Sequence, residues 1–508
     1  MRRLAFRNER VFYRRKCDGT GESIVSIYPP DSPYKVYKSD YFFSDKWNAM
    51  DFGRDFDFNR PFFKQFHEMK LQVPRLAIHN VNHHNSEYCN TCVGNKNSYF
   101  IFGGDYNEDC MYGVLCAYNK TSLDIDYCYR SELLYFCSDT LESYGSRFLF
   151  NCSHCSDSYF CEECVGCHDC ILSFDLKNQQ YCIENKKYSR EEYFERKKAL
   201  ITGKLSDTQK LFEKFKEMRG HRIVKYGHIV SCQNCTGDYI KNSKNCTKCF
   251  DIKDGEDSRE IIYGITLKDC FHCDLVGLNS TLIFNSVSVM DDYNIVMSFW
   301  VLDCSNVAYS DFCMNSHDLF GCAGLKHKQF CILNKQYSEE EYKTLRAKII
   351  EHMKKTGEWG KFFPPELSCF GYNETTAQTY FPLIKEQALK LGYKWYDEAF
   401  KSHTKQTYQI PDDIKDVTDE ILNEVLECPG CGKNYKILDQ ELRFLRQQNI
   451  PILGQCAYCR IKQRELLRNN RELFNRTCAK CGVGFKTTYA PDRPETIYCE
   501  KCYLEAVY

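Results

Sequence analysis

Eight cysteines near the C-terminus have the spacing of metal ligands. They form four Cys-x2-Cys pairs, and each pair can present two sulfurs from one tight turn. A zinc ion takes four such thiolates in a tetrahedron, which leaves no open position for a substrate, so sites of this kind are structural. We therefore predict two structural Zn2+ sites. Their ligands are Cys428, Cys431, Cys456 and Cys459 in the first, and Cys478, Cys481, Cys499 and Cys502 in the second.

Two further cysteine clusters allow more than one interpretation. The first is close to a ferredoxin run but lacks its last spacing and the following proline, and it consists of Cys161, Cys164, Cys167 and Cys170. Because Cys152 and Cys164, like Cys170 and Cys182, are twelve residues apart, we favour a stack of small buried side chains over a further zinc or iron–sulfur site. The second cluster has two closely spaced pairs that would suit zinc: Cys232, Cys235, Cys246 and Cys249.

Basic residues gather at the two ends of the chain. Residues 1–16 carry an excess of arginine, and the segment between the two predicted zinc sites is a basic amphipathic helix. Basic helices beside zinc ribbons suit the phosphate backbone of nucleic acids, and the alternative is a solvated charged face. The candidate nucleic-acid-binding residues are Arg460, Lys462, Arg464, Arg468, Arg471 and Arg476.

The composition limits the class of protein. Hydrophobic residues make up 43% and charged residues 27% of the 508 residues, which excludes global disorder. The net charge of −1 gives no general attraction to nucleic acids or membranes. The N-terminus lacks the apolar segment of a signal peptide, and no apolar run is long enough to span a membrane, so we expect a cytoplasmic protein. The 33 cysteines should then be thiols or metal ligands rather than disulfides.

The elements that position these residues belong to an internal duplication. The segment from Leu176 to Ser189 matches the segment from Leu325 to Ser338, and both serines are suitable N-caps for the charged helices that follow. Within each copy, a small polar residue precedes a short apolar run at intervals of 10–14 residues. This spacing favours a β-solenoid, similar to a parallel β-helix, over an ordinary antiparallel β domain. We expect a mainly β fold with helical insertions, in which zinc-ribbon modules flank a duplicated solenoid.

The two ends of the chain are also related to each other. Cys17, followed by residues 28–33, aligns without a gap with Cys478, followed by residues 489–494. In this alignment Thr20, Lys38 and Tyr41 stand in the places of Cys481, Cys499 and Cys502. One thiolate cannot hold a tetrahedral zinc ion, so we expect the N-terminal module to keep the fold of the ribbon without its metal.

These patterns divide the chain into five parts. Residues 1–83 are predicted to be a degenerate zinc-ribbon-like module with a docking helix, and residues 84–219 and 220–356 the two solenoid copies, each with a helix. Residues 357–426 are predicted to be a connector, and residues 427–508 are predicted to be tandem zinc-binding modules. A helix over residues 439–448 and a second one after Cys459 indicate a treble-clef-like arrangement of the first zinc module.

Three segments resemble a group of uncharacterised zinc-ribbon proteins of candidate-phyla bacteria. They are residues 44–63, residues 428–460, which are similar to a small zinc-ribbon domain, and residues 487–503. The resemblance implies zinc binding and a bacterial source, and it brings no known activity. The chain departs from the pattern at Thr20, Lys38 and Tyr41.

We find no Ser/His/Asp or Cys/His catalytic pattern and no phosphate-binding glycine loop in the sequence. We therefore expect a binding or scaffold protein rather than an enzyme, with nucleic acid or another protein as its partner. Two other hypotheses remain open. One is a metal-dependent or iron–sulfur redox enzyme that uses the cysteines from Cys152 to Cys182, and the other is carbohydrate binding along the tyrosine-rich solenoid face.

Overall fold

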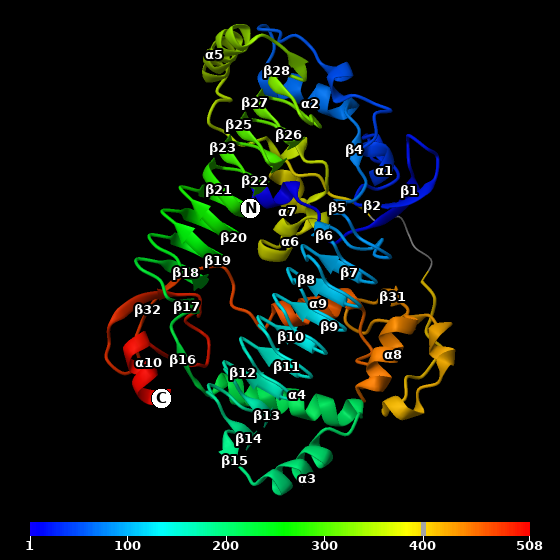
Figure 1. Cartoon of the computed structure of the whole chain (residues 1–508), viewed down its shortest axis with the longest axis vertical. Coiled ribbons are helices and arrows are strands. Elements are labelled where there is room, and N and C mark those ends of the chain that lie inside the picture. The colour runs from blue at the N-terminus through cyan, green and yellow to red at the C-terminus, as the bar shows by residue number, and fades with distance from the viewer. Residues whose placement is uncertain (398–402, 508) are drawn as a thin grey trace.

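The computed structural model describes residues 1–397 and 403–507 and shows a mainly β protein. Two long, mostly parallel sheets dominate it (Figure 1). Among the described residues, no helix is both long and apolar enough to cross a membrane.

The first sheet is built from short strands that pair in chain order. Each strand lies parallel to the next at an offset of twelve residues, so that Tyr99 pairs with Met111 and Met111 with Leu123. The strands are β7 (Tyr99–Phe102), β8 (Met111–Val114), β9 (Leu123–Asp126), β10 (Tyr135–Ser138), β11 (Arg147–Phe150), β12 (Tyr159–Glu162), β13 (His168–Ile171), β14 (Gln180–Ile183) and the antiparallel β15 (Lys186–Lys187). One further pair of short parallel strands, β5 (Asn80–Val81) and β6 (Cys92–Val93), precedes it with the same offset.

The second sheet is also mainly parallel, but it divides into two series of strands. Its strands are β17 (Ile229–Val230), β18 (Thr236–Lys241), β19 (Thr247–Glu256), β20 (Arg259–Lys268), β21 (Phe271–Phe284), β22 (Val287–Met290), β23 (Tyr293–Val296), β24 (Phe299–Leu302), β25 (Ser305–Ala308), β26 (Asp311–Met314), β27 (His317–Phe320), β28 (Gln329–Ile332) and the antiparallel β29 (Lys335–Gln336). The division comes after β21, which pairs with both β22 and β23; β22, β24 and β26 then pair in one series while β23, β25 and β27 pair in another. As expected, Ser189 caps the helix after the first sheet, α3 (Arg190–Leu200), and Ser338 caps the helix after the second, α5 (Glu339–Lys355).

A left-handed residue at nearly every third position turns the chain in both sheets. Phe100, Tyr112, Asp124 and Phe136 have φ between 55° and 61°. This conformation costs an L-residue about 1–2 kcal/mol, so the hydrogen bonds between successive turns and the packed interior must offset it. The interior side chains also recur at every third position, where cysteine, serine, asparagine and aliphatic residues are buried.

The two sheets start near the middle of the molecule and extend to opposite ends (Figure 1). α4 (Leu205–Gly220) connects them, and α2 (Phe62–Gln72) packs against the second sheet through Phe62 and Phe66. Residues 357–397 add α6 (Thr376–Tyr380) and α7 (Lys385–Lys390). The acidic segment before Cys428 forms two short 3-10 turns, Ile414–Asp416 and Asp419–Leu422.

Two small hairpin modules occupy the ends of the chain. The N-terminal module has β1 (Tyr13–Lys16), β2 (Ser23–Ser26), β3 (Val36–Tyr37) and α1 (Ser39–Phe42). The C-terminal module has the same order: β32 (Phe474–Thr477), β33 (Gly484–Thr487), β34 (Thr496–Tyr498) and α10 (Glu500–Val507). β3 pairs with β4 (Arg75–Leu76) before the first sheet, and β34 pairs with β16 (Ile223–Lys225) before the second, both in parallel.

Candidate metal centres and their setting

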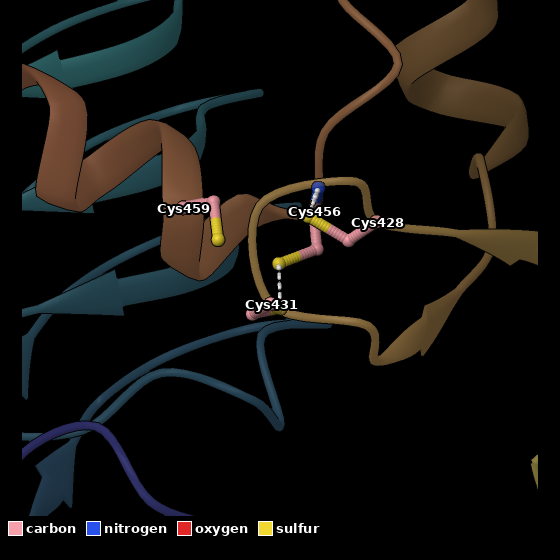
Figure 2. A group of neighbouring side chains, drawn as sticks. All are labelled: Cys428, Cys431, Cys456 and Cys459. Carbon is pink, nitrogen blue, oxygen red and sulfur yellow. Dashed lines mark hydrogen bonds between the residues drawn. The ribbon is translucent and has the colours of Figure 1, made fainter.

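The first group of four cysteines comes from a turn and a helix end. Cys428 and Cys431 lie in the turn between β30 (Leu426–Glu427) and β31 (Asn434–Tyr435), and α8 (Asp439–Gln447) follows. Cys456 is the N-cap of α9 (Ala457–Glu465), whose first turn carries Cys459. The four sulfurs lie within 4.8 Å of one another, and Figure 2 shows the four side chains as neighbours, with Cys459 on the helix and the others around the turn.

The distances and hydrogen bonds of this group suit a bound cation. The sulfurs of Cys431 and Cys456 are 3.7 Å apart. Two sulfurs on a tetrahedral zinc ion at 2.3 Å are about 3.8 Å apart. Burial raises the pKa of Cys428, but the backbone N–H groups of Cys456 and Gly430 outweigh it and bring the pKa down to about 7. Cys428 is thus prepared to act as a thiolate ligand.

The second group also consists of four cysteines, but different strands and a different helix position them. Cys478 and Cys481 follow β32, Cys499 follows β34, and Cys502 lies in α10. The sulfurs of Cys481 and Cys499 are 3.8 Å apart. Burial raises the pKa of Cys478, and the N–H groups of Cys499 and Cys481 overcome this effect and lower it to about 6. Both groups could therefore bind a metal such as zinc, and each supplies a complete set of four soft ligands.

The other cysteine clusters do not converge in this way. Within residues 1–397 and 403–507, only the two C-terminal groups bring three or more ligand atoms within 4.8 Å of one another. Cys161, Cys164, Cys167 and Cys170 are buried inside the first sheet. The Cys161 thiol faces the carbonyl oxygens of Tyr159 and Cys170 at 3.4 and 3.6 Å, and Cys170 is in register with Cys182. This arrangement is the expected stack of small buried side chains.

The cysteines at the start of the second sheet are arranged similarly. Cys246 and Cys249 are buried and Cys232 and Cys235 half-buried. The Cys232 thiol donates to the carbonyl of Val230 at 3.2 Å. No metal group forms among these four in the described part of the chain.

The N-terminal module keeps the backbone of the second site with one cysteine. The N–H of Lys38 donates to the Cys17 sulfur at 3.3 Å, the contact that the N–H of Cys499 makes with Cys478. Lys38 pairs with Glu22 at 2.7 Å. The ring of Tyr41 lies where a side chain on Gly19 would have to be. The ion pair and the ring fill the place of the missing ligands.

The segment that leads from the first metal group to the second is fixed by buried ion pairs. Arg460 pairs with Asp124 at 2.9 Å and with Glu441 at 2.9 Å. Arg464 pairs with Asp124 at 2.7 Å and with Asp126 at 2.8 Å, and its side chain is fully buried. Both arginines therefore contact the first sheet and α8 instead of solvent.

The next two arginines contact both sheets. Arg468 lies between the rings of Tyr127 and Tyr239, 3.8 and 4.0 Å from their centres, and pairs with Asp139 and Asp251. Arg471 also pairs with Asp251, at 2.5 Å. Asp139 follows β10 in the first sheet and Asp251 lies in β19 of the second, so this segment joins the two sheets.

The expected basic surface is therefore largely absent. Four of its six residues are held by carboxylates inside the molecule; Lys462 is exposed, and Arg476 donates to the carbonyl of Ala490 at 2.6 Å. Sequence reasoning missed the partners of the arginines. The available signal was acidic residues within apolar strands, as in Leu123-Asp124-Ile125-Asp126.

Comparisons with known proteins assign neither a family nor a function to the chain. No protein-family profile matches the chain, and a search of curated proteins gives no significant match.

Proposed function

We propose that this protein is a non-enzymatic, zinc-binding scaffold whose body consists of two β-solenoids, residues 84–219 and 220–356. The twelve-residue register and the left-handed corners support the solenoid geometry. The hairpin of β32 and β33, which holds Cys478 and Cys481, supports a zinc ribbon, with Cys499 and Cys502 supplied by the start of α10. The turn and helix that hold Cys428 and Cys456 support a treble clef. Both metals would be structural, because four cysteines occupy all four positions of each ion.

The arginine segment between the two metal groups carries this proposal. It starts at Cys456 and Cys459, contacts both sheets through Arg464 and Arg468, and ends at Cys478. A zinc ion at each end would fix both ends of this segment. The metals would then hold the two solenoids in one arrangement and keep the surface of the scaffold constant.

Metal analysis followed by chelation tests the proposal. We expect two zinc ions per chain in protein purified without a metal-affinity tag. Removing them with a strong chelator should make residues 403–507 sensitive to limited proteolysis, while residues 84–219 stay resistant. A chain with no bound zinc, or one whose protease sensitivity does not change on chelation, would refute the proposal.

Nucleic-acid binding remains a second candidate, confined to the hairpin of β32 and β33. Arg476, Phe485 and Lys486 line a shallow surface there, and Lys486 is exposed. A cation beside an aromatic ring suits single-stranded nucleic acid. Lys486→Glu should abolish retention of labelled single-stranded RNA, and unchanged retention would exclude this hairpin as the binding surface.

A further inference from the structure

A large cleft lies where the N-terminus, α6, α9 and the arginine segment meet. Its volume is about 950 Å³, which is within the range of small-molecule sites. One wall is formed by Glu9, Arg10 and Val11, and another by residues 373–382. The exposed side of α9 and the segment that follows it close the third side. The cleft is thus built from parts of the chain that are far apart in sequence.

The carboxylates of this cleft are largely engaged within the protein. Glu465 pairs with Arg10 at 2.7 Å, and Glu9 pairs with Arg7. Glu374 accepts hydrogen bonds from the hydroxyl of Tyr13 at 2.7 Å and from the N–H of Gly371 at 2.6 Å. The remaining carboxylate, Glu472, lies exposed to solvent. Inside the cleft, little acceptor capacity is left for a cationic ligand.

Two cationic side chains of the cleft, in contrast, have donors without partners among the described residues. Nε of Arg10 is buried and has no hydrogen-bond partner among the described residues. Lys462 is exposed on α9, and within the described part of the chain its ammonium group makes no ion pair. An unmade hydrogen bond to a buried charged donor costs free energy, which an anionic ligand group would recover.

Aromatic rings line the same cleft. Phe381 and Tyr458 are exposed, at 38% and 43% of their surface. The guanidinium of Arg471 stacks on Tyr380, 3.9 Å from the ring centre, and holds that ring in place. Rings fixed in this way offer a flat apolar surface at a small entropy cost.

We propose that this cleft binds a small anionic molecule that carries a flat ring, with its phosphate or carboxylate at Arg10 and Lys462 and its ring against Phe381, Tyr380 and Tyr458. This inference goes beyond the scaffold function and does not depend on it.

Calorimetric titration of the zinc-loaded full chain with phenyl phosphate tests the site. Phenyl phosphate should bind more tightly than phenol or inorganic phosphate, because only it engages both donors and rings. Lys462→Ala should weaken binding about tenfold, the loss of one charge-assisted contact. Lys501→Ala removes an exposed lysine outside the cleft and should leave the affinity unchanged.

Benzoate in place of phenyl phosphate identifies the anion. Tighter binding of benzoate assigns the site to carboxylates, and weaker binding assigns it to phosphates. Phe381→Ala should weaken both ring-bearing anions and leave inorganic phosphate unaffected. The proposal is overturned if phenyl phosphate does not bind at millimolar concentration, if phenol binds equally well, or if Lys462→Ala has no effect while the variant remains folded.

Discussion

Arg464 donates from Nε to Asp126 across 2.8 Å in an ion pair that is closed to solvent. It joins the segment between the two metal groups to the first sheet. Arg3 makes the corresponding contact with Asp274 of the second sheet at 3.0 Å. Arg3 precedes β1 as Arg464 precedes β32, so the relationship between the two ends of the chain includes this ion pair as well as the hairpins.

Arg464→Met should therefore destabilise the protein strongly. Burial already raises the pKa of Asp126 to about 6, although Arg464 opposes the shift. Without Arg464, Asp124 and Asp126 lose their common partner, and breaking a buried pair on one side costs about 3–5 kcal/mol. Urea unfolding measures the effect. The free energy of unfolding of Lys462→Met, on the exposed side of the same helix, should stay within about 0.5 kcal/mol of the wild type. Equal losses of unfolding free energy in both variants would contradict a stabilising role of the buried ion pair.

The N-terminal hairpin should accept a metal once its ligands are restored. The hydrogen bonds Cys17 N–Glu22 O and Cys478 N–Val483 O measure 2.8 and 2.9 Å, so the two turns have the same backbone geometry. The triple change Thr20→Cys, Lys38→Cys and Tyr41→Cys completes four thiols around Cys17. We expect elemental analysis to give one zinc ion per chain more than in the wild type.

The matched control is the same triple change with Cys17→Ser. Three cysteines and a serine should bind the added zinc far more weakly, so that gel filtration in a mild chelator removes it. If the metal content of the four-cysteine variant equals that of the wild type, the equivalence of the two hairpins does not extend to the positions of their side chains.

The buried cysteines of the first sheet should tolerate serine. The Cys164 thiol faces the carbonyls of Glu162 and Ser173 at 3.6 and 3.5 Å, and the hydroxyl of Ser158 makes the same kind of contact with Ser156 at 2.9 Å. Serine can thus satisfy its hydroxyl inside the stack. Cys164→Ser should change the free energy of unfolding by only about 1 kcal/mol and leave the zinc content unchanged.

The contrasting variant is Cys428→Ser, which removes a converging ligand and should cost one zinc ion per chain. Loss of metal from Cys164→Ser, or absorption near 400 nm in anaerobically purified wild type, would place a metal centre in the first sheet and contradict the stack.

Some features followed from the sequence because they depend on local spacing. The two groups of four cysteines were found from Cys-x2-Cys pairs, since each pair needs only one tight turn. Ser189 and Ser338 were identified as N-caps because serine is favoured at the start of a helix and a charged helical segment follows each of them. The structure adds that Glu192 and Glu341 complete a capping box with each serine. The twelve-residue spacing of Cys152 and Cys164 anticipated a stack, because a regular register repeats the same side-chain position in every turn.

Other features depend on contacts between distant segments and could not be predicted this way. The charge of Arg468 suggested a surface for nucleic acid, but its partners Asp139 and Asp251 come from different sheets, and no local pattern connects them. The cleft at Arg10 and Lys462 forms only when the N-terminus meets α9. The left-handed conformation of Phe100 and Tyr112 was also unforeseen, since aromatic residues rarely adopt it.

His228 should make stability depend on pH. Its ring lies between Asp238, 2.8 Å from Nδ1, and Glu163, 3.0 Å from Nε2, and it stacks on Tyr239. Burial alone would lower the pKa of His228, but Tyr239, Asp238 and Glu163 together raise it well above its ordinary value. The same contact lowers the pKa of Asp238 to about 2, against the effect of burial.

A raised histidine pKa stabilises the folded state fully below the unfolded value of about 6.5, and this contribution disappears as the pH rises through the folded value. A depressed aspartate pKa acts in the other direction, and its contribution is lost as the pH falls toward about 2. Comparing urea unfolding of wild type and His228→Gln should thus show a large difference near pH 6 that shrinks in alkaline solution. His327→Gln, at an exposed position, should show no such trend. A difference that stays constant with pH would mean that His228 contributes through packing alone and carries no charge in the folded protein.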